Sequence, residues 1–235
     1  MPVWSPVASE HGAGREPVGV VRSGLAGSRF QHDFSTPEVI AVLHLLVGST
    51  GVKMLGEGEW KTKKHGADYP RQWRKAHLGI DAQTLEIRAI EVTSNSVGDA
   101  PVLPELLTQV ATPMATVTGD GAYDTKACHA AIAAVGAVAI IPARKNAWLW
   151  KKYPPGAETR NEIVKATQRL GRAIWKKWSG YQRGSLVETK KRCFKLLGER
   201  IMFRDFDRQV AELQVRAALH NRFTQLGTLV TVAMP

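Results

Sequence analysis

The chain has 235 residues, 44% of them hydrophobic, and its 32 Lys and Arg against 21 Asp and Glu give a formal net charge of +11 and a pI near 9.9. This composition is typical of a globular protein with one large or two small domains, and no apolar run reaches the roughly 20 residues of a membrane-spanning helix. The two cysteines, Cys128 and Cys193, have no Cys or His partners at metal-ligand spacing, which argues against a disulfide framework or a zinc site and favours a reduced, cytoplasmic protein.

The positive charge is concentrated in one region of the chain. The segment 144–204 contains 17 Lys and Arg against four Asp and Glu, a net charge of +13, whereas the rest of the chain carries about −2. A surface of this charge favours a polyanionic partner, for which nucleic acid is the first candidate.

The first half of the chain predicts mostly strands. Residues 1–40 are rich in Gly, Pro and Ser without periodicity, and we interpret them as a poorly ordered or replaced N-terminal segment. An apolar run over 39–47 predicts a buried strand, with a helical turn at 37–43 as the alternative. After a turn at 56–58, alternating patterns over 73–81 and 85–93 predict a β-hairpin.

The second half alternates helices with short strands. Helices are expected at 96–110, with Asp99 as the N-cap, and at 125–135, ended by Gly136. Short strands are expected at 115–118 and 137–141. A basic, Trp-rich insertion at about 143–180 contains an amphipathic helix over 161–178, and further helices follow at 185–197 and 205–221. This order predicts a mixed α/β fold of the ribonuclease H type, with a five-stranded sheet flanked by helices.

Asp120 is the first candidate for chemistry. It lies between two glycines in Thr-Gly-Asp-Gly-Ala-Tyr-Asp, directly after the expected strand at 115–118. A carboxylate at the carboxyl end of a strand is well placed to face a ligand, and the glycines allow close approach. The alternative is a turn aspartate that binds its own backbone. We expect Asp124, four residues later, to be a helix N-cap.

Glu188 belongs to a set of residues on one helical stripe. Tyr181, Gly184, Glu188 and Lys195 are separated by 3, 4 and 7 residues, and Arg192 follows Glu188 by four. A carboxylate for metal, an aromatic hydroxyl and a lysine for phosphate suit a site of DNA strand cleavage. The alternative is an ion pair between Glu188 and Arg192 on a solvated helix.

The tryptophans of the insertion have two interpretations. They either stack on splayed bases among the neighbouring lysines or form the core of the insertion. They are Trp148, Trp150, Trp175 and Trp178.

Three blocks of sequence resemble the catalytic domain of bacterial insertion-sequence transposases of the IS5 group, within the IS4-like DDE class. The first combines Leu-Leu-Val-Gly-Ser-Thr-Gly-Val-Lys with Gly-Glu-Gly-Glu-Trp and Trp-Arg-Lys-Ala-His-Leu-Gly-Ile-Asp. The second is Gly-Asp-Gly-Ala-Tyr-Asp-Thr. The third is the helix from Tyr181 to Lys195, followed by Arg-Asp-Phe-Asp-Arg-Gln-Val-Ala-Glu-Leu. The blocks occur in family order and place the catalytic domain at 41–226, with a tail at 227–235.

The resemblance implies a ribonuclease H-like domain in which two aspartates and a glutamate hold two divalent cations. Asp120 would be the second aspartate and Glu188 the glutamate, so both are expected metal ligands, with Mg²⁺ as the cofactor and Mn²⁺ as a substitute. The metals would activate water, and then a 3′-hydroxyl, for attack on DNA. Tyr181 and Lys195 would contact DNA near the scissile phosphate. Further expected DNA contacts are Arg183, Arg192 and Lys145.

Two positions differ from the family pattern. Gly48 stands where the first aspartate is expected, and Gly184 stands where a helix arginine is expected. Arg183 is adjacent to Gly184 but lies about 100° round the helix, which makes it a poor substitute. Only 47 residues precede Gly48, too few for the usual DNA-binding part. The chain therefore resembles a truncated, degenerate family member, unless a frameshift or misplaced start has replaced its N-terminus.

These observations predict a metal-dependent DNA transposase, impaired at Gly48, whose partner is double-stranded DNA at element ends and target. The first alternative is a non-catalytic, DNA-binding transposase relic. A ribonuclease H-like nuclease with a different metal set is a second, against which the helix from Tyr181 to Lys195 argues. A homodimer is left open, and no membrane partner is expected.

Overall fold

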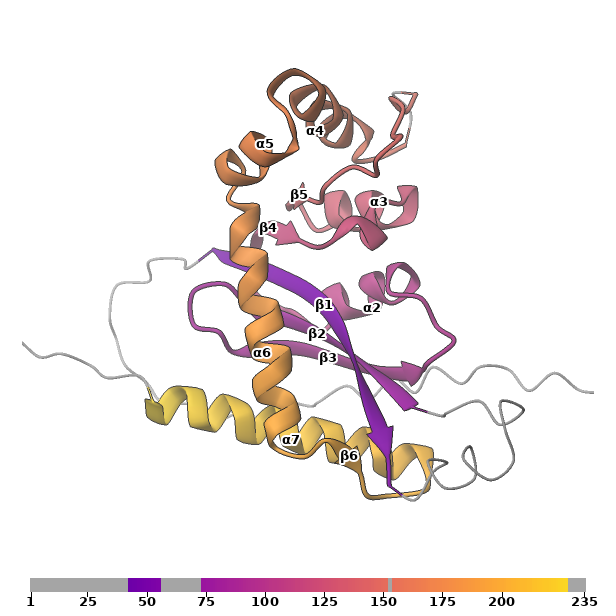
Figure 1. Ribbon diagram of the computed structural model, residues 1–235, viewed down its shortest axis with the longest axis vertical. Helices are drawn as coiled ribbons and strands as arrows, with labels where there is room; N and C mark the ends of the chain where they lie inside the picture. Colours follow the sequence, from indigo (N-terminus) through magenta and orange to yellow (C-terminus); the bar gives the residue numbers. More distant parts are fainter. Residues whose placement is uncertain (1–41, 56–72, 152–153, 228–235) are drawn as a thin grey trace, which may run out of the picture.

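The computed structural model describes residues 42–55, 73–151 and 154–227 (Figure 1). The strands are β1 (Leu43–Met54), β2 (Trp73–Asp81), β3 (Ile87–Ser94), β4 (Met114–Thr118), β5 (Val138–Ile140) and β6 (Arg200–Ile201). The α-helices are α2 (Leu103–Thr108), α3 (Lys126–Ala134), α4 (Ala157–Leu170), α5 (Arg172–Trp178), α6 (Ser185–Leu196) and α7 (Phe206–Gly227). Short 3₁₀ helices are η2 (Ala100–Val102), η3 (Gly121–Tyr123) and η4 (Tyr181–Gly184).

The strands form one mixed sheet with the order β3-β2-β1-β4-β5. The first three strands are an antiparallel meander, and β4 and β5 run parallel to β1. These five strands confirm the predicted sheet. The two-residue strand β6, which pairs with the far end of β1 at Lys53 and Met54, was not predicted.

Helices cover both faces of this sheet. On one face, α6 and α7 pack through Val187, Phe194 and Leu213 against residues of the first three strands. On the other face, α2 and α3 pack against β1, β4 and β5. Successive side chains of β1 therefore enter different cores: Leu46 faces α6 and α7, whereas Val47 belongs to the core beneath α2 and α3. The result is an α/β/α arrangement with β1 at its centre.

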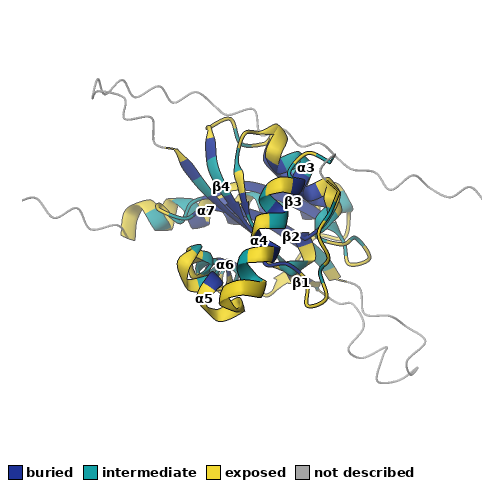
Figure 2. Cartoon of the chain, turned by 90° about the horizontal axis from the view of Figure 1, so that it is seen from above, coloured by how far each residue is buried: buried dark blue, intermediate teal, exposed yellow. Residues whose placement is uncertain are grey.

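The basic insertion forms a small helical unit with its own core. Ala143, Ile163, Val164 and Trp175 are its buried members. The helix expected at 161–178 is in fact two helices, because Gly171 adopts a φ of +82° and ends α4. Figure 2 shows that α4 and α5 are exposed over much of their surface. The insertion is therefore an outlying part of the fold.

Two expected helix caps are corrected by the structure. Asp99 precedes η2 without a side-chain capping bond, and its carboxylate accepts hydrogen bonds from Ser49 Oγ at 2.8 Å and Lys75 Nζ at 2.7 Å instead. Asp124 is not the N-cap of α3. Thr125 takes that place, and its hydroxyl accepts a hydrogen bond from the Cys128 backbone N–H.

Some expectations lie outside the described residues. These are the N-terminal segment 1–40, the turn at 56–58, most of the tail at 227–235 and the start of the strand expected from residue 39. Among the described helices, none has both the length and the apolar character needed to cross a membrane.

Candidate active site

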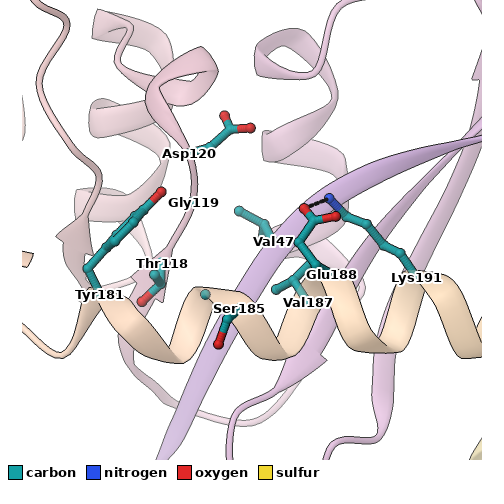
Figure 3. A pocket seen from close by; sticks show the side chains of 10 residues that line it. Val47, Thr118, Gly119, Asp120, Tyr181, Ser185, Val187, Glu188 and Lys191 are labelled. Atoms are coloured by element: carbon teal, nitrogen blue, oxygen red, sulfur yellow. Dashed lines mark hydrogen bonds and ion pairs between the residues drawn. The ribbon is translucent and has the colours of Figure 1, made fainter.

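The middle of β1 borders a cleft because its partners leave a gap there. β4 pairs with β1 only as far as Leu46, and β6 pairs only from Lys53. In this gap a cavity of about 200 Å³ lies between the end of β4, β1 and the start of α6 (Figure 3). We call it the carboxylate cleft. It is lined by Val47, Thr118, Gly119, Asp120, Tyr181, Gly184, Ser185, Val187, Glu188 and Lys191.

Asp120 lines the cleft from the loop that follows β4. Its carboxylate accepts a hydrogen bond from the Ala122 backbone N–H at 2.8 Å, so it also caps η3 as the turn interpretation predicted. A Cβ at Gly119 would lie only 2.8 Å from Cδ2 of Tyr123, which is fully buried. Glycine is thus required before Asp120 for the loop to pack on Tyr123.

Glu188 lines the same cleft from the first turn of α6. Tyr181 and Gly184 also line it from η4, a 3₁₀ helix that ends at Gly184, directly before α6 begins at Ser185. Partial burial, together with the negative charge of Asp120, raises the pKa of the Tyr181 hydroxyl; Arg172 opposes this and Glu188 adds to it. The structure therefore brings Asp120, Tyr181 and Glu188 together around one cleft.

Lys191 occupies the part of the cleft into which a side chain at position 48 would project. Its Nζ lies 2.7 Å from Glu188 Oε1, and its side chain is only 12% exposed. A Cβ on Gly48 would meet both Cε and Nζ of Lys191 at 2.8 Å. The partner of Glu188 is therefore Lys191, one turn along the helix, and the alternative pairing with Arg192 is wrong.

The residues present do not fit a pair of divalent cations. Two cations held close together need several carboxylates to offset their charge and complete their coordination. The cleft offers Asp120 and Glu188, and Glu188 is already paired with an ammonium group. Across the described ranges, no group of three or more His, Cys, Asp or Glu side chains is arranged to hold a metal ion. A two-metal centre would require a further carboxylate and the displacement of Lys191.

The other predicted site residues lie outside the cleft. Arg183, Arg192 and Lys195 are exposed and do not line it, and Lys145 lines a separate pocket.

The core interpretation holds for some of the tryptophans, and others are exposed. Trp175 is buried in the insertion core, and Trp150 packs against Arg160 with the guanidinium carbon 4.2 Å from the ring centroid. Trp148 and Trp178 are 86% and 78% exposed.

Sequence reasoning missed Lys191, although the signal was present. Val187, Lys191 and Phe194 are spaced by four and three residues, and both apolar members are buried. A lysine at that spacing lies on the inner face of the helix, where its ammonium group needs a partner.

Comparison with known proteins places the chain in a family. A family model described as the transposase DDE domain matches residues 43–222, well over half of the chain. No solved structure matches the chain. Domains of this family act on DNA and generally use divalent metal ions. The match spans β1, the loop of Asp120, the insertion and α6, so the carboxylate cleft lies wholly within it. The chain belongs to the family of transposase DDE domains.

Proposed function

We propose that this chain is an insertion-sequence transposase of the IS5 group that binds DNA but is impaired in metal-dependent strand cleavage. The observation that carries the proposal is the position of Lys191. Its ammonium group pairs with Glu188 and stands where a side chain at position 48 would project. A positive charge at this point opposes the entry of divalent cations, and the missing carboxylate removes a ligand that would attract them.

DNA binding is supported by charge and placement. The segment 144–204, with a net charge of +13, includes the insertion, η4 and α6, and residues of η4 and α6 line the carboxylate cleft. Cationic side chains on such a surface bind phosphates without any need for metal. Double-stranded DNA at the ends of the element and at the target is the proposed partner, and a homodimer would be needed to hold two ends together.

A second candidate function is the complete transposition reaction with Mg²⁺ or Mn²⁺. The observation in its favour is that Asp120 and Glu188 line one cleft. In that case a residue outside the described ranges, or the DNA itself, would have to complete the metal coordination and draw Glu188 away from Lys191.

A plasmid-nicking assay tests the proposal. The substrate carries the DNA that flanks the gene, and the proteins are the parent, Gly48→Asp and Gly48→Asp/Lys191→Met, each with Mg²⁺ and with Mn²⁺. We expect the parent to bind the DNA without nicking it. We expect the double variant to nick more than Gly48→Asp alone, because only the double variant removes the ammonium group that occupies the cleft.

Controls separate the two candidates. Asp120→Ala is introduced into each protein, and true nicking at this site must disappear with it. Nicking by the parent that Asp120→Ala abolishes would overturn the impaired assignment in favour of the complete reaction. A parent that binds no DNA would overturn the proposal as a whole.

A further inference from the structure

A second pocket, lined by cationic side chains, lies in the insertion. It has a volume of about 300 Å³ and is lined by Ala143, Arg144, Lys145, Ala147, Val164, Thr167, Gln168 and Arg172. We call it the basic pocket. Three of these side chains are cationic and none is acidic. We propose that the basic pocket binds a backbone phosphate of the DNA whose neighbouring phosphates reach the carboxylate cleft, an inference that rests on the proposed DNA-binding function.

The pocket is built from three segments that the fold holds together. Thr167 and Gln168 come from the last turns of α4, Arg172 begins α5, and residues 143–147 follow β5. The Arg172 guanidinium donates a hydrogen bond to the Ala143 carbonyl at 2.6 Å, which joins α5 to the segment after β5. Buried side chains of the insertion core, Ala143 and Val164, form the apolar part of its wall.

The chemistry of the lining favours an anion. Arg144, Lys145 and Arg172 repel one another, so an anion between them lowers the free energy of the folded state. The buried hydroxyl oxygen of Thr167, a residue of the pocket wall, has no hydrogen-bond partner among the residues that the structure describes. Gln168 adds an amide. Charge-assisted hydrogen bonds of this kind are those that phosphate groups prefer.

The position of the pocket connects it to the carboxylate cleft. Nε of Arg144 donates to the backbone carbonyl of Gly121 at 3.4 Å, and Gly121 directly follows Asp120. Tyr181, which lines the carboxylate cleft, packs against Trp175 of α5, with the ring centroids 6.1 Å apart, and α5 begins at Arg172 of the basic pocket. A DNA strand that enters the cleft therefore brings an adjacent phosphate to the basic pocket.

Neighbouring residues of α4 provide a matched test. Gln168→Glu adds one negative charge to the pocket lining, whereas Arg169→Gln removes one positive charge from the exposed next residue, which does not line it. Both variants lower the net charge by one. Affinity for a labelled DNA duplex is measured by fluorescence anisotropy across 50–200 mM salt, with Lys145→Gln as a second pocket variant.

We expect Gln168→Glu to weaken duplex binding about tenfold at the lowest salt concentration. The slope of log affinity against log salt concentration should fall by about the amount that corresponds to one phosphate contact. Lys145→Gln should act in the same direction, and Arg169→Gln should change affinity less than about threefold with an unaltered slope. Equal effects of Gln168→Glu and Arg169→Gln would overturn the pocket assignment and leave the proposed function intact.

Two further outcomes are decisive. Thermal unfolding is measured in phosphate and in chloride at equal ionic strength. If phosphate stabilises the parent but not Gln168→Glu, while both bind DNA equally, the pocket takes free phosphate and the DNA assignment is overturned. If the parent binds no DNA at all, the proposed function and the pocket assignment fail together.

Discussion

The ammonium group of Lys191 lies 2.8 Å from the point at which a Cβ on Gly48 would stand. The two residues are 143 positions apart in sequence, yet any side chain at position 48 would contact Lys191. The space that a side chain at position 48 would need is therefore taken by Lys191 of α6. An aspartate introduced there would have to displace the end of Lys191 and also Cγ1 of Val187, which lies equally close.

Gly48→Ala is predicted to destabilise the protein. A Cβ at this position would meet Val187 Cγ1, which is held in a buried helix face, at 2.8 Å. Overpacking of this kind typically costs about 1–3 kcal/mol, which outweighs the roughly 0.5–1 kcal/mol that alanine recovers in backbone entropy. Urea denaturation of the parent and Gly48→Ala measures the difference in the free energy of unfolding.

A double-mutant cycle with Val187→Ala is the control for this prediction. If the clash is the cause, Gly48→Ala should cost much less in the Val187→Ala background, with a coupling energy of about 1 kcal/mol or more. Additive effects would show that Val187 is not the source of the clash.

Most of the fold could be predicted from the sequence because its signals are local. The alternation on either side of Asp81-Ala82-Gln83-Thr84 predicted β2 and β3, and the apolar spacing around Val102 predicted η2 and α2, although these are shorter than expected. Asp120 and Glu188 were predicted to share a site from their motifs, and both line the carboxylate cleft.

The remaining features depend on contacts between distant segments. β6 has only two residues, too few for any periodicity, and forms because Arg200 pairs with Lys53 of β1. Asp124 has the sequence position of a helix cap, but its carboxylate forms a buried ion pair with Arg160, 36 residues away. The spacing of residues along the sequence does not predict which distant segments will pair in this way.

Gly184→Arg is predicted to be tolerated and to strengthen DNA binding. Gly184 has helical backbone angles, and a Cβ there would meet no described atom within 4 Å. The new guanidinium would stand at the edge of the carboxylate cleft, which Gly184 lines. We expect a several-fold gain in duplex affinity by anisotropy and a gain of about 0.5–1 kcal/mol in stability. Gly184→Ala should reproduce the stability gain alone; an equal gain in affinity from alanine would contradict the electrostatic explanation.

Arg160→Met is predicted to be strongly destabilising. Arg160 Nε lies 3.1 Å from Asp124 Oδ1, and the two side chains are 4% and 2% exposed. Burial alone would raise the pKa of Asp124, but its interactions with His129, whose Nε2 lies 3.4 Å away, and with Arg160 hold it well below its ordinary value. Removing the guanidinium takes the cationic partner from a buried carboxylate, at a cost of about 3–5 kcal/mol by chemical denaturation.

The double variant Asp124→Asn/Arg160→Met tests the cause of that loss. It removes both charges, so it should be more stable than Arg160→Met alone. If Arg160→Met is at least as stable as the double variant, the buried charge is not the cause of the loss. The pH dependence gives a second check. Because the folded-state pKa of Asp124 is lowered, its stabilisation is present above the ordinary value of 3.8 and is lost as the pH falls below it. This acid-sensitive component should be absent from the double variant.

His77 is predicted to make stability fall between pH 6.5 and pH 4. Burial lowers its pKa from 6.5 to about 4; the Asp99 carboxylate opposes the shift, and the Lys75 ammonium adds to it. In this range the unfolded chain binds a proton that the folded protein excludes, so acidification favours unfolding. A pKa difference of this size corresponds to about 3 kcal/mol for a fully buried side chain.

His77→Gln provides the measurement for this last prediction. In the parent, His77 Nε2 lies 2.9 Å from Thr93 Oγ1. Glutamine keeps a hydrogen-bonding group near this hydroxyl, but the glutamine side chain does not titrate. Urea midpoints from pH 4.5 to 7.5 should therefore depend less steeply on pH in the variant than in the parent. The slope that remains comes from other groups, including His220, whose pKa is also lowered by burial. Identical slopes in the two proteins would mean that His77 has the same pKa in the folded and unfolded states. That result would contradict the prediction that the enclosure of His77 between β1 and β3 lowers its pKa.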